Sequence, residues 1–205
     1  MTERQLLLLA CIAALTGSGL TPFDRFTWFL EVLPVLIAMP ILVATRRRFP
    51  LTPLAYRLLF VHALILIVGG HYTYARVPAG FAVQHLFHLA RNPYDGLGHL
   101  AQGFVPAILA REVLLRKTPL RRGGWLFFLV VSVCLAISAA YELFEWGTAI
   151  ASGAGAEDFL GTQGDVWDTQ KDMLLALIGS IAAQLLLAGR HDRELGASQA
   201  LETAP

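Results

Sequence analysis

Six long apolar runs dominate this 205-residue chain and restrict what it can fold into. A helix needs about 20 mostly apolar residues to cross the hydrocarbon core of a bilayer. No water is available there, so each run must pair its own backbone N–H and C=O groups as a helix. None of the runs alternates like a membrane β-barrel strand. We therefore predict an all-α, polytopic membrane bundle of about six transmembrane helices. The runs cover residues 5–20, 26–45, 54–69, 98–115, 125–141 and 173–188.

The composition argues against two other classes of protein. Hydrophobic residues make up 56% of the chain and charged residues 15%, whereas a disordered chain needs low hydrophobicity and high charge. The 16 basic and 15 acidic residues give a formal net charge of +1, without the basic excess that marks nucleic-acid binders. We therefore expect the lipid bilayer, and not nucleic acid, as the main partner. The sequence identifies no protein partner.

The basic residues indicate the orientation of the helices, because short cytoplasmic loops are enriched in Lys and Arg. Arg4 precedes the first run, and basic clusters lie at residues 46–48, 116–122 and 190–193. Six spans place all of these on one side of the membrane. We therefore predict a multi-pass protein with both termini in the cytoplasm. A rival interpretation makes residues 4–19 a signal peptide, which would leave five spans in the same orientation.

We expect one transmembrane domain, residues 1–190, followed by a short disordered tail at residues 191–205. Two long loops, at about residues 70–97 and 142–172, should face outward, and nine of the 15 acidic residues lie in or beside the outer loops. An HLFH stretch in the first loop fits an interfacial amphipathic helix. Ionisable groups at membrane level are costly unless they are paired or line a wet cavity, so the outer face is the candidate functional region.

Acidic and histidine residues occur at helical spacing at three predicted helix ends. Residues three or four apart share one face of a helix, and three sets have this spacing. If the helices pack together, the three polar faces could converge on one site. The sets are Asp95 with His99, Glu142 with Glu145, and Asp165 with Asp168 and Asp172.

Such a site could hold a divalent metal ion. Carboxylate oxygens suit Mg²⁺, Ca²⁺ or Mn²⁺, and an imidazole makes Zn²⁺ or Fe possible. In this hypothesis Glu142, Glu145 and His99 are the catalytic acid and base groups. The metal ligands are Asp165, Asp168, Asp172 and His71. Supporting or substrate-binding residues are Arg91, Tyr94, Asp95, Gln163 and Trp167.

The same residues also have structural interpretations. Acidic groups in the first turn of a helix stabilise its dipole, so Asp165 could simply be a cap. Glu142 and Glu145 could pair with Arg91 or Lys171 in an ion network. These alternatives stay open at the level of sequence.

Three stretches resemble the YjdF family of predicted bacterial inner-membrane proteins. They read HYTYARVP, RNPYDGLGHLAQGFVPAILAREVL and YELFEWGTAIASGAGAEDFLGTQGDVWDTQKDM. The resemblance covers most of the chain from the third run to the sixth, and it implies a location in the bacterial inner membrane. The family is described as a domain of unknown function, so the resemblance implies little chemistry.

A weaker resemblance is to the VanZ-like membrane proteins associated with glycopeptide-antibiotic resistance. Those proteins carry an Asp and a His opening one helix, an acidic residue ending the next, and an Asp before a helix of small residues. Asp95 with His99, Glu142, and Asp168 with Asp172 follow a similar order. The Asn and Lys of that pattern have no clear counterpart here.

Three classes of function remain open. The first is an enzyme, with a metal-dependent site at the outer face that acts on a lipid-linked or envelope substrate. The second is a protein that binds or transports a small molecule or ion. The third is a non-catalytic structural or accessory subunit. The chain contains no Walker A, HExxH or GxSxG motif that would decide between them.

Overall fold

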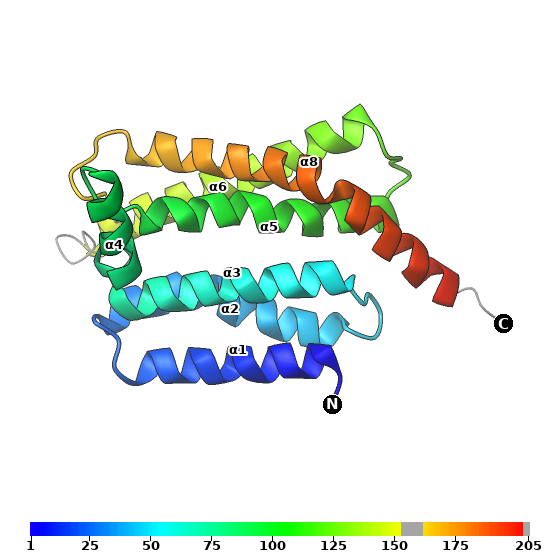
Figure 1. Cartoon of the computed structure of the whole chain (residues 1–205), viewed down its shortest axis with the longest axis horizontal. Helices are drawn as coiled ribbons and strands as arrows, with labels where there is room; N and C mark the ends of the chain where they lie inside the picture. Colours follow the sequence, from blue (N-terminus) through cyan, green and yellow to red (C-terminus); the bar gives the residue numbers. More distant parts are fainter. Residues whose placement is uncertain (153–161, 203–205) are drawn as a thin grey trace.

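A computed structural model describes residues 1–152 and 162–202, and this part of the chain consists of helices and the segments that connect them (Figure 1). Residues 153–161 of the second predicted loop, with Glu157 and Asp158, lie outside the described residues. The elements in order are α1 (Glu3–Leu20), α2 (Arg25–Thr45), α3 (Pro53–Tyr72), η1 (Tyr74–Arg76), α4 (Pro78–Phe87), α5 (Tyr94–Lys117), α6 (Gly124–Ser152) and α8 (Asp168–Glu202).

The first three helices begin at side-chain caps. Thr2 forms a capping box before α1. Asp24 accepts a 2.7 Å hydrogen bond from the backbone N–H of Thr27, which lowers the pKa of the Asp24 carboxyl. Thr52 caps α3, where Pro53 occupies the first turn without losing a needed N–H group. These polar caps set the boundaries between the apolar runs.

Within the described residues, four helices are long and apolar enough to cross a membrane: α2, α3, residues 124–151 of α6 and residues 168–197 of α8. The prediction of a helical membrane bundle is therefore confirmed in its class. The other two long helices, α1 and α5, fall outside this set. Polar residues at its N-terminal end reduce the apolar length of α1, and α5 carries charged residues near both ends.

The long helices form two groups. Figure 1 shows α1, α2 and α3 on one side and α5, α6 and α8 on the other, and α3 and α5 make the main contact between the groups. The most extensive helix pair is α5 with α8. A Cβ atom on Gly103 would lie 1.9 Å from the backbone oxygen of Ala176. Glycine is therefore required where these two backbones approach each other, as in other small-residue contacts between membrane helices.

The loops are shorter than the sequence predicts. Residues 70–97 contain the end of α3, then η1 and α4, and the start of α5, while residues 142–152 belong to α6. Helix α4 lies across the end of the bundle (Figure 1). Phe81, Leu86 and Phe87 on α4 are exposed, as an interfacial helix would require.

The C-terminal segment is helical where the sequence predicts a disordered tail. Helix α8 continues to Glu202, and the side chain of His191 is fully buried against α5. Disorder was expected because residues 191–205 are polar. This polar composition does not show that residues on α5 contact the segment and hold it in place.

Candidate functional site

Three helices bring acidic residues together at the end of the bundle where α4 lies. Helix α5 contributes Asp95 and His99 from its first turns, because residues four apart share one face. Helix α6 contributes Glu142 and Glu145, and α8 contributes Asp172; all five of these residues are at least 90% buried. The polar helix faces that the sequence predicts to be functional therefore converge around His99.

The imidazole of His99 lies among carboxylates from three helices. Its Nε2 atom is 3.5 Å from Asp95 Oδ1 and 3.9 Å from Asp172 Oδ2. Its Nδ1 atom is 3.2 Å from Gln102 Oε1 and 3.6 Å from Glu142 Oε1. Both neighbours of Nδ1 are acceptor oxygens, so a proton on Nδ1 would be hydrogen-bonded to Gln102. The Nε2 atom then faces the two aspartates.

Asp95, His99 and Asp172 form a group that could hold a metal ion, with one potential ligand atom from each lying within 4.8 Å of the others. Asp95 Oδ2, Asp172 Oδ1 and Glu142 Oε1 are buried without a hydrogen-bond partner among the described residues. Buried polar atoms in proteins are normally paired. A bound cation, a water molecule or a proton on a carboxyl group would satisfy these oxygens.

A second set of buried polar residues extends the site toward α2. Glu31 is only 3% exposed, although it lies within an apolar run. Glu31 and Glu145 line the same cavity as Asp95 and His99, together with Tyr74 and Tyr141. The sequence signal for Glu31 is one carboxylate within an apolar helix, which by itself does not show which site it joins.

Arg91 ties the start of α8 to the segment before α5. Its Nη1 atom donates to Asp168 Oδ1, and to the backbone oxygen of Thr162 over 2.9 Å. Asp165 Oδ2 lies 3.8 Å from Arg91 Nη2 and receives a 2.5 Å hydrogen bond from Lys171. The Lys171 ammonium lowers the pKa of the Asp165 carboxyl. Partial burial lowers the pKa of Arg91. The adjacent Asp168 carboxylate raises it, and the pKa of Arg91 is raised overall.

The structure changes the expected set of metal ligands. Of the four predicted ligands, Asp172 alone belongs to the three-residue group, in which Asp95 and His99 replace the others. Asp165 and Asp168 contact Arg91 instead. His71 lies elsewhere: its Nδ1 atom is 2.9 Å from the backbone oxygen of Ser18. Asp168 and Asp172 are about one turn apart along α8, so Asp168 meets Arg91 at the start of the helix and Asp172 lies one turn further along, beside His99.

The predicted supporting residues have different contacts. Gln163 exchanges two hydrogen bonds with the backbone of Asn92, at 3.1 and 3.0 Å, and so reinforces the Arg91 contact. The Tyr94 hydroxyl donates to the backbone oxygen of Ile65 over 3.0 Å. Trp167 is 62% exposed. None of these three residues belongs to the group around His99.

Comparison with known proteins identifies the family. A family model described as "Predicted membrane protein (DUF2238)" matches residues 4–193. The chain belongs to the DUF2238 family. It is 56% identical over 178 residues to the inner membrane protein YjdF of Escherichia coli (strain K12), covering 87% of this chain and 85% of that protein. No solved structure matches the chain. The YjdF-like family suggested by the sequence motifs is thus confirmed.

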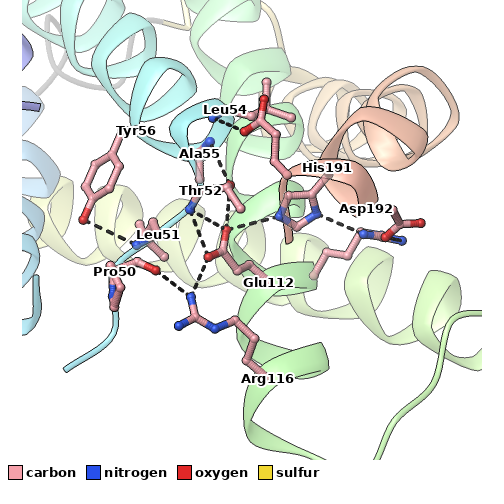
Figure 2. A network of polar contacts seen from close by, with 12 residues as sticks. Pro50, Leu51, Thr52, Leu54, Ala55, Tyr56, Glu112, Arg116, His191 and Asp192 are labelled. Atoms are coloured by element: carbon pink, nitrogen blue, oxygen red, sulfur yellow. Dashed lines mark hydrogen bonds and ion pairs between the residues drawn. The ribbon is translucent and has the colours of Figure 1, made fainter. Parts of the chain in front are cut away.

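This DUF2238 chain also contains a polar network at the opposite end of the bundle, which the sequence analysis does not predict (Figure 2). The Glu112 side chain is fully buried. Its carboxylate accepts hydrogen bonds from the backbone N–H and hydroxyl of Thr52, at 3.1 and 2.8 Å, and from Arg116 at 2.8 Å. His191 Nε2 lies 3.2 Å from Glu112, and its Nδ1 lies 2.9 Å from Arg111. Because Arg111 can only donate, the ring is held with its proton on Nε2.

This second network ties three helices together. Thr52 caps α3, Glu112 lies near the end of α5 and His191 lies on α8. The sequence signal was the charged pair Arg111 and Glu112 inside an apolar run, but their partners are about 60 and 80 residues away in the chain. The contacts of Glu112 and His191 therefore link α3, α5 and α8.

Replacing Arg91 with alanine is expected to loosen the start of α8. The change removes the bonds to Asp168 and Thr162 and leaves a buried carboxylate without its cation. Amide hydrogen exchange at residues 162–172 should accelerate by about tenfold to 100-fold, since a bond to a charged group contributes roughly 1.5–3 kcal/mol. Arg25→Ala, at the start of α2, serves as a control and should leave exchange in this segment unchanged. Unchanged protection in Arg91→Ala would contradict the role given to Arg91.

Proposed function

We propose that this chain is an inner-membrane enzyme that binds a divalent cation at Asp95, His99 and Asp172 and acts on a lipid-linked or envelope substrate at the outer face of the membrane. In this proposal all six long helices cross the bilayer and both termini lie in the cytoplasm. The observation that carries it is the meeting of His99 Nε2 with two aspartates whose remaining oxygens are buried and unpartnered.

The proposed orientation is supported by the distribution of charge along the bundle. The two termini and the α2–α3 and α5–α6 connections lie at one end in Figure 1. Those connections carry the basic clusters at residues 46–48 and 116–122, which are expected on the cytoplasmic side. The group around His99 lies at the opposite end and would therefore face outward. Helices α1 and α5 run beside apolar helices that are long enough to span.

The distances around His99 suit a shared ion better than direct hydrogen bonds. Metal–ligand distances to nitrogen and oxygen are about 2.0–2.2 Å for zinc, so two ligand atoms on one ion lie at most about 4.4 Å apart. The separations of 3.5 and 3.9 Å from His99 Nε2 fall within this limit, and the three ligand atoms lie within 4.8 Å of one another, so the carboxylates would close slightly around an ion. Hydrogen bonds would be about 2.7–3.2 Å long.

The neighbours of His99 match the surroundings of known metal-binding histidines. A ligating histidine usually donates its other ring N–H to a carboxylate or carbonyl oxygen, which holds the ring and strengthens the ligand. Gln102 and Glu142 provide these oxygens at His99 Nδ1. A bound divalent cation would polarise a phosphoryl or carbonyl oxygen, or activate water. Glu142 and Glu145 lie beside it as candidate proton acceptors.

Metal content provides the test, with Zn²⁺ and Mn²⁺ as the probes. We expect about one ion per chain in the detergent-purified protein, and loss of that ion in Asp172→Asn and His99→Ala. Glu142→Gln should weaken affinity roughly 10–100-fold, as for other residues that support a ligand. Asp165→Asn is the matched control, because Asp165 contacts Lys171 and Arg91 instead of His99, and it should retain the ion.

Two results would overturn the proposal. One is the absence of bound metal in the folded wild type after supplementation. The other is equal metal content in the wild type and in folded Asp172→Asn. If the carboxylate variants lost stability and there was no ion to lose, the alternative of a structural or accessory subunit would be favoured.

A further inference from the structure

An elongated cavity separates α2 from α5 and α6. It has a volume of about 420 Å³, within the roughly 300–1,000 Å³ range of small-molecule sites. Most of its lining is apolar and comes from α1, α2, α3, α5 and α6. The lining includes Leu8, Val35, Met39, Leu59, Phe60 and Ile137. Because α3 makes the main contact with α5, the space beside α2 remains open to an apolar ligand.

The two ends of the cavity carry opposite charges. Glu31, Asp95 and Glu145 line the outer end, while Arg4 and Arg46 line the other end, which our topology places at the cytoplasm. Glu31 and Arg46 are 15 residues apart on α2, so the cavity follows the helix for roughly 22 Å at 1.5 Å per residue. An amphiphile with a negative headgroup would be attracted to the arginine end and repelled by the carboxylate end.

The arginine end presents donors suited to a phosphate. The Arg4 and Arg46 side chains are exposed. The Arg4 guanidinium lies over the ring of Tyr56, 4.9 Å from its centroid. Arg46 Nη1 donates to the backbone oxygen of Val43 over 2.8 Å, which holds the guanidinium at the end of α2. Guanidinium groups match phosphate geometry with paired donors, and basic residues at the cytoplasmic surface attract anionic lipids.

We propose that this cavity binds one anionic glycerophospholipid, with its phosphate at Arg4 and Arg46 and one acyl chain extending along α2 toward Glu31. Asp95 and His99 of the metal group line the outer end of this cavity, whereas the lipid phosphate would lie at the opposite end, at Arg4 and Arg46. Binding would place the end of the chain against the wall that Glu31 and Tyr141 share with that group.

Native mass spectrometry of the whole protein tests the site, with phosphatidylglycerol and phosphatidylcholine of identical acyl chains as probes. The wild type should retain one phosphatidylglycerol in preference to phosphatidylcholine. Ala38→Trp and the milder Ala38→Leu fill the cavity from α2, and the tryptophan should lower retention of phosphatidylglycerol by about tenfold or more. Ile37→Trp is the matched control, because Ile37 is 53% exposed and absent from the lining.

The arginines test the orientation of the lipid. Arg4→Gln and Arg46→Gln should each weaken phosphatidylglycerol binding by about tenfold and weaken phosphatidylcholine binding less, because both lipids carry a phosphate but only phosphatidylglycerol has a net negative charge. A photoreactive group at the end of the acyl chain should crosslink near Glu31 and Tyr141. Crosslinking near Arg46 would reverse the orientation and overturn the proposal.

His62, midway along α3, is a polar residue in the mostly apolar lining of the cavity. It lines the cavity, and its buried Nε2 atom has no hydrogen-bond partner in the described part of the chain. Since an acyl chain packs better against leucine, His62→Leu should keep or strengthen lipid retention. A loss of about tenfold would show that the occupant is polar at this depth and would overturn the proposal.

Two further outcomes would overturn the lipid site: equal retention of the two lipids by the wild type, or equal losses in folded Ala38→Trp and Ile37→Trp. Metal content should be unchanged in all of the cavity variants. Failure of lipid binding is therefore distinguishable from failure of the metal proposal.

Discussion

Replacing Glu112 with alanine is expected to lower the free energy of unfolding by about 3–5 kcal/mol, the cost of breaking a buried ion pair by removing one partner. Glu112 is fully buried and accepts hydrogen bonds from Thr52, Arg116 and His191. The alanine variant leaves those donors unpaired and separates α3 from the ends of α5 and α8. Denaturation in detergent, followed by circular dichroism, measures the change.

Two variants serve as controls for the effect of Glu112→Ala on the free energy of unfolding. Glu112→Gln keeps the shape and can still accept a hydrogen bond from Thr52, so we expect a smaller loss than for alanine. Glu3→Ala removes an exposed carboxylate that pairs with Arg57 at 2.6 Å, and surface ion pairs contribute little. We therefore expect no measurable change in Glu3→Ala. Equal stability of Glu112→Ala and Glu3→Ala would show that the network in Figure 2 does not hold the helices together.

Replacing Gly103 with valine should cost at least the upper end of the roughly 1–3 kcal/mol typical of overpacking. A single Cβ atom at this position would lie 1.9 Å from the backbone oxygen of Ala176. Because the contact is with backbone, no side-chain rotation relieves it, and α5 and α8 must move apart. Gly103→Ala should show the same effect to a smaller degree. Unfolding in detergent and a spin-label distance between the two helices measure stability and separation.

Gly147 provides the matched control for Gly103. It also lies within a helix, α6, but a Cβ atom there would meet nothing within 4 Å. Gly147→Ala should therefore stabilise the protein by about 0.5–1 kcal/mol, because alanine loses less conformational freedom than glycine in a helix. If Gly103→Val and Gly147→Ala had the same effect, the close approach of α5 and α8 would be ruled out.

Much of the fold follows from local chemistry that can be read along the chain. The apolar runs predict the long helices to within a few residues for α2 and α3. Asp24 and Thr52 begin helices because their side chains accept hydrogen bonds from nearby backbone N–H groups. The four-residue spacing of Asp95 and His99 places them on one face of α5. Each of these features depends on residues close together in sequence, which is why the sequence reveals them.

The tail and the ligand set show where local patterns are insufficient. Residues 191–197 have the composition of a polar tail, yet His191 is buried against α5. Glu112 accepts a hydrogen bond from the His191 ring, and Arg111 donates one to it. The spacing of Asp165, Asp168 and Asp172 predicts one shared face. Arg91, 77 residues from Asp168, pairs with Asp168, while Asp172 faces His99.

The sequence by itself determined the class of protein, the long helices and the residues able to supply a polar site at one end of the bundle, because hydropathy and helical spacing are local properties. Only the tertiary structure decided that Asp95, His99 and Asp172 form the metal-capable group, that Glu112 and His191 are partners, and that a cavity joins Arg46 to Glu31. Those features depend on how the helices rotate and pack, and packing is set by contacts such as that of Gly103 with Ala176, between residues far apart in the chain.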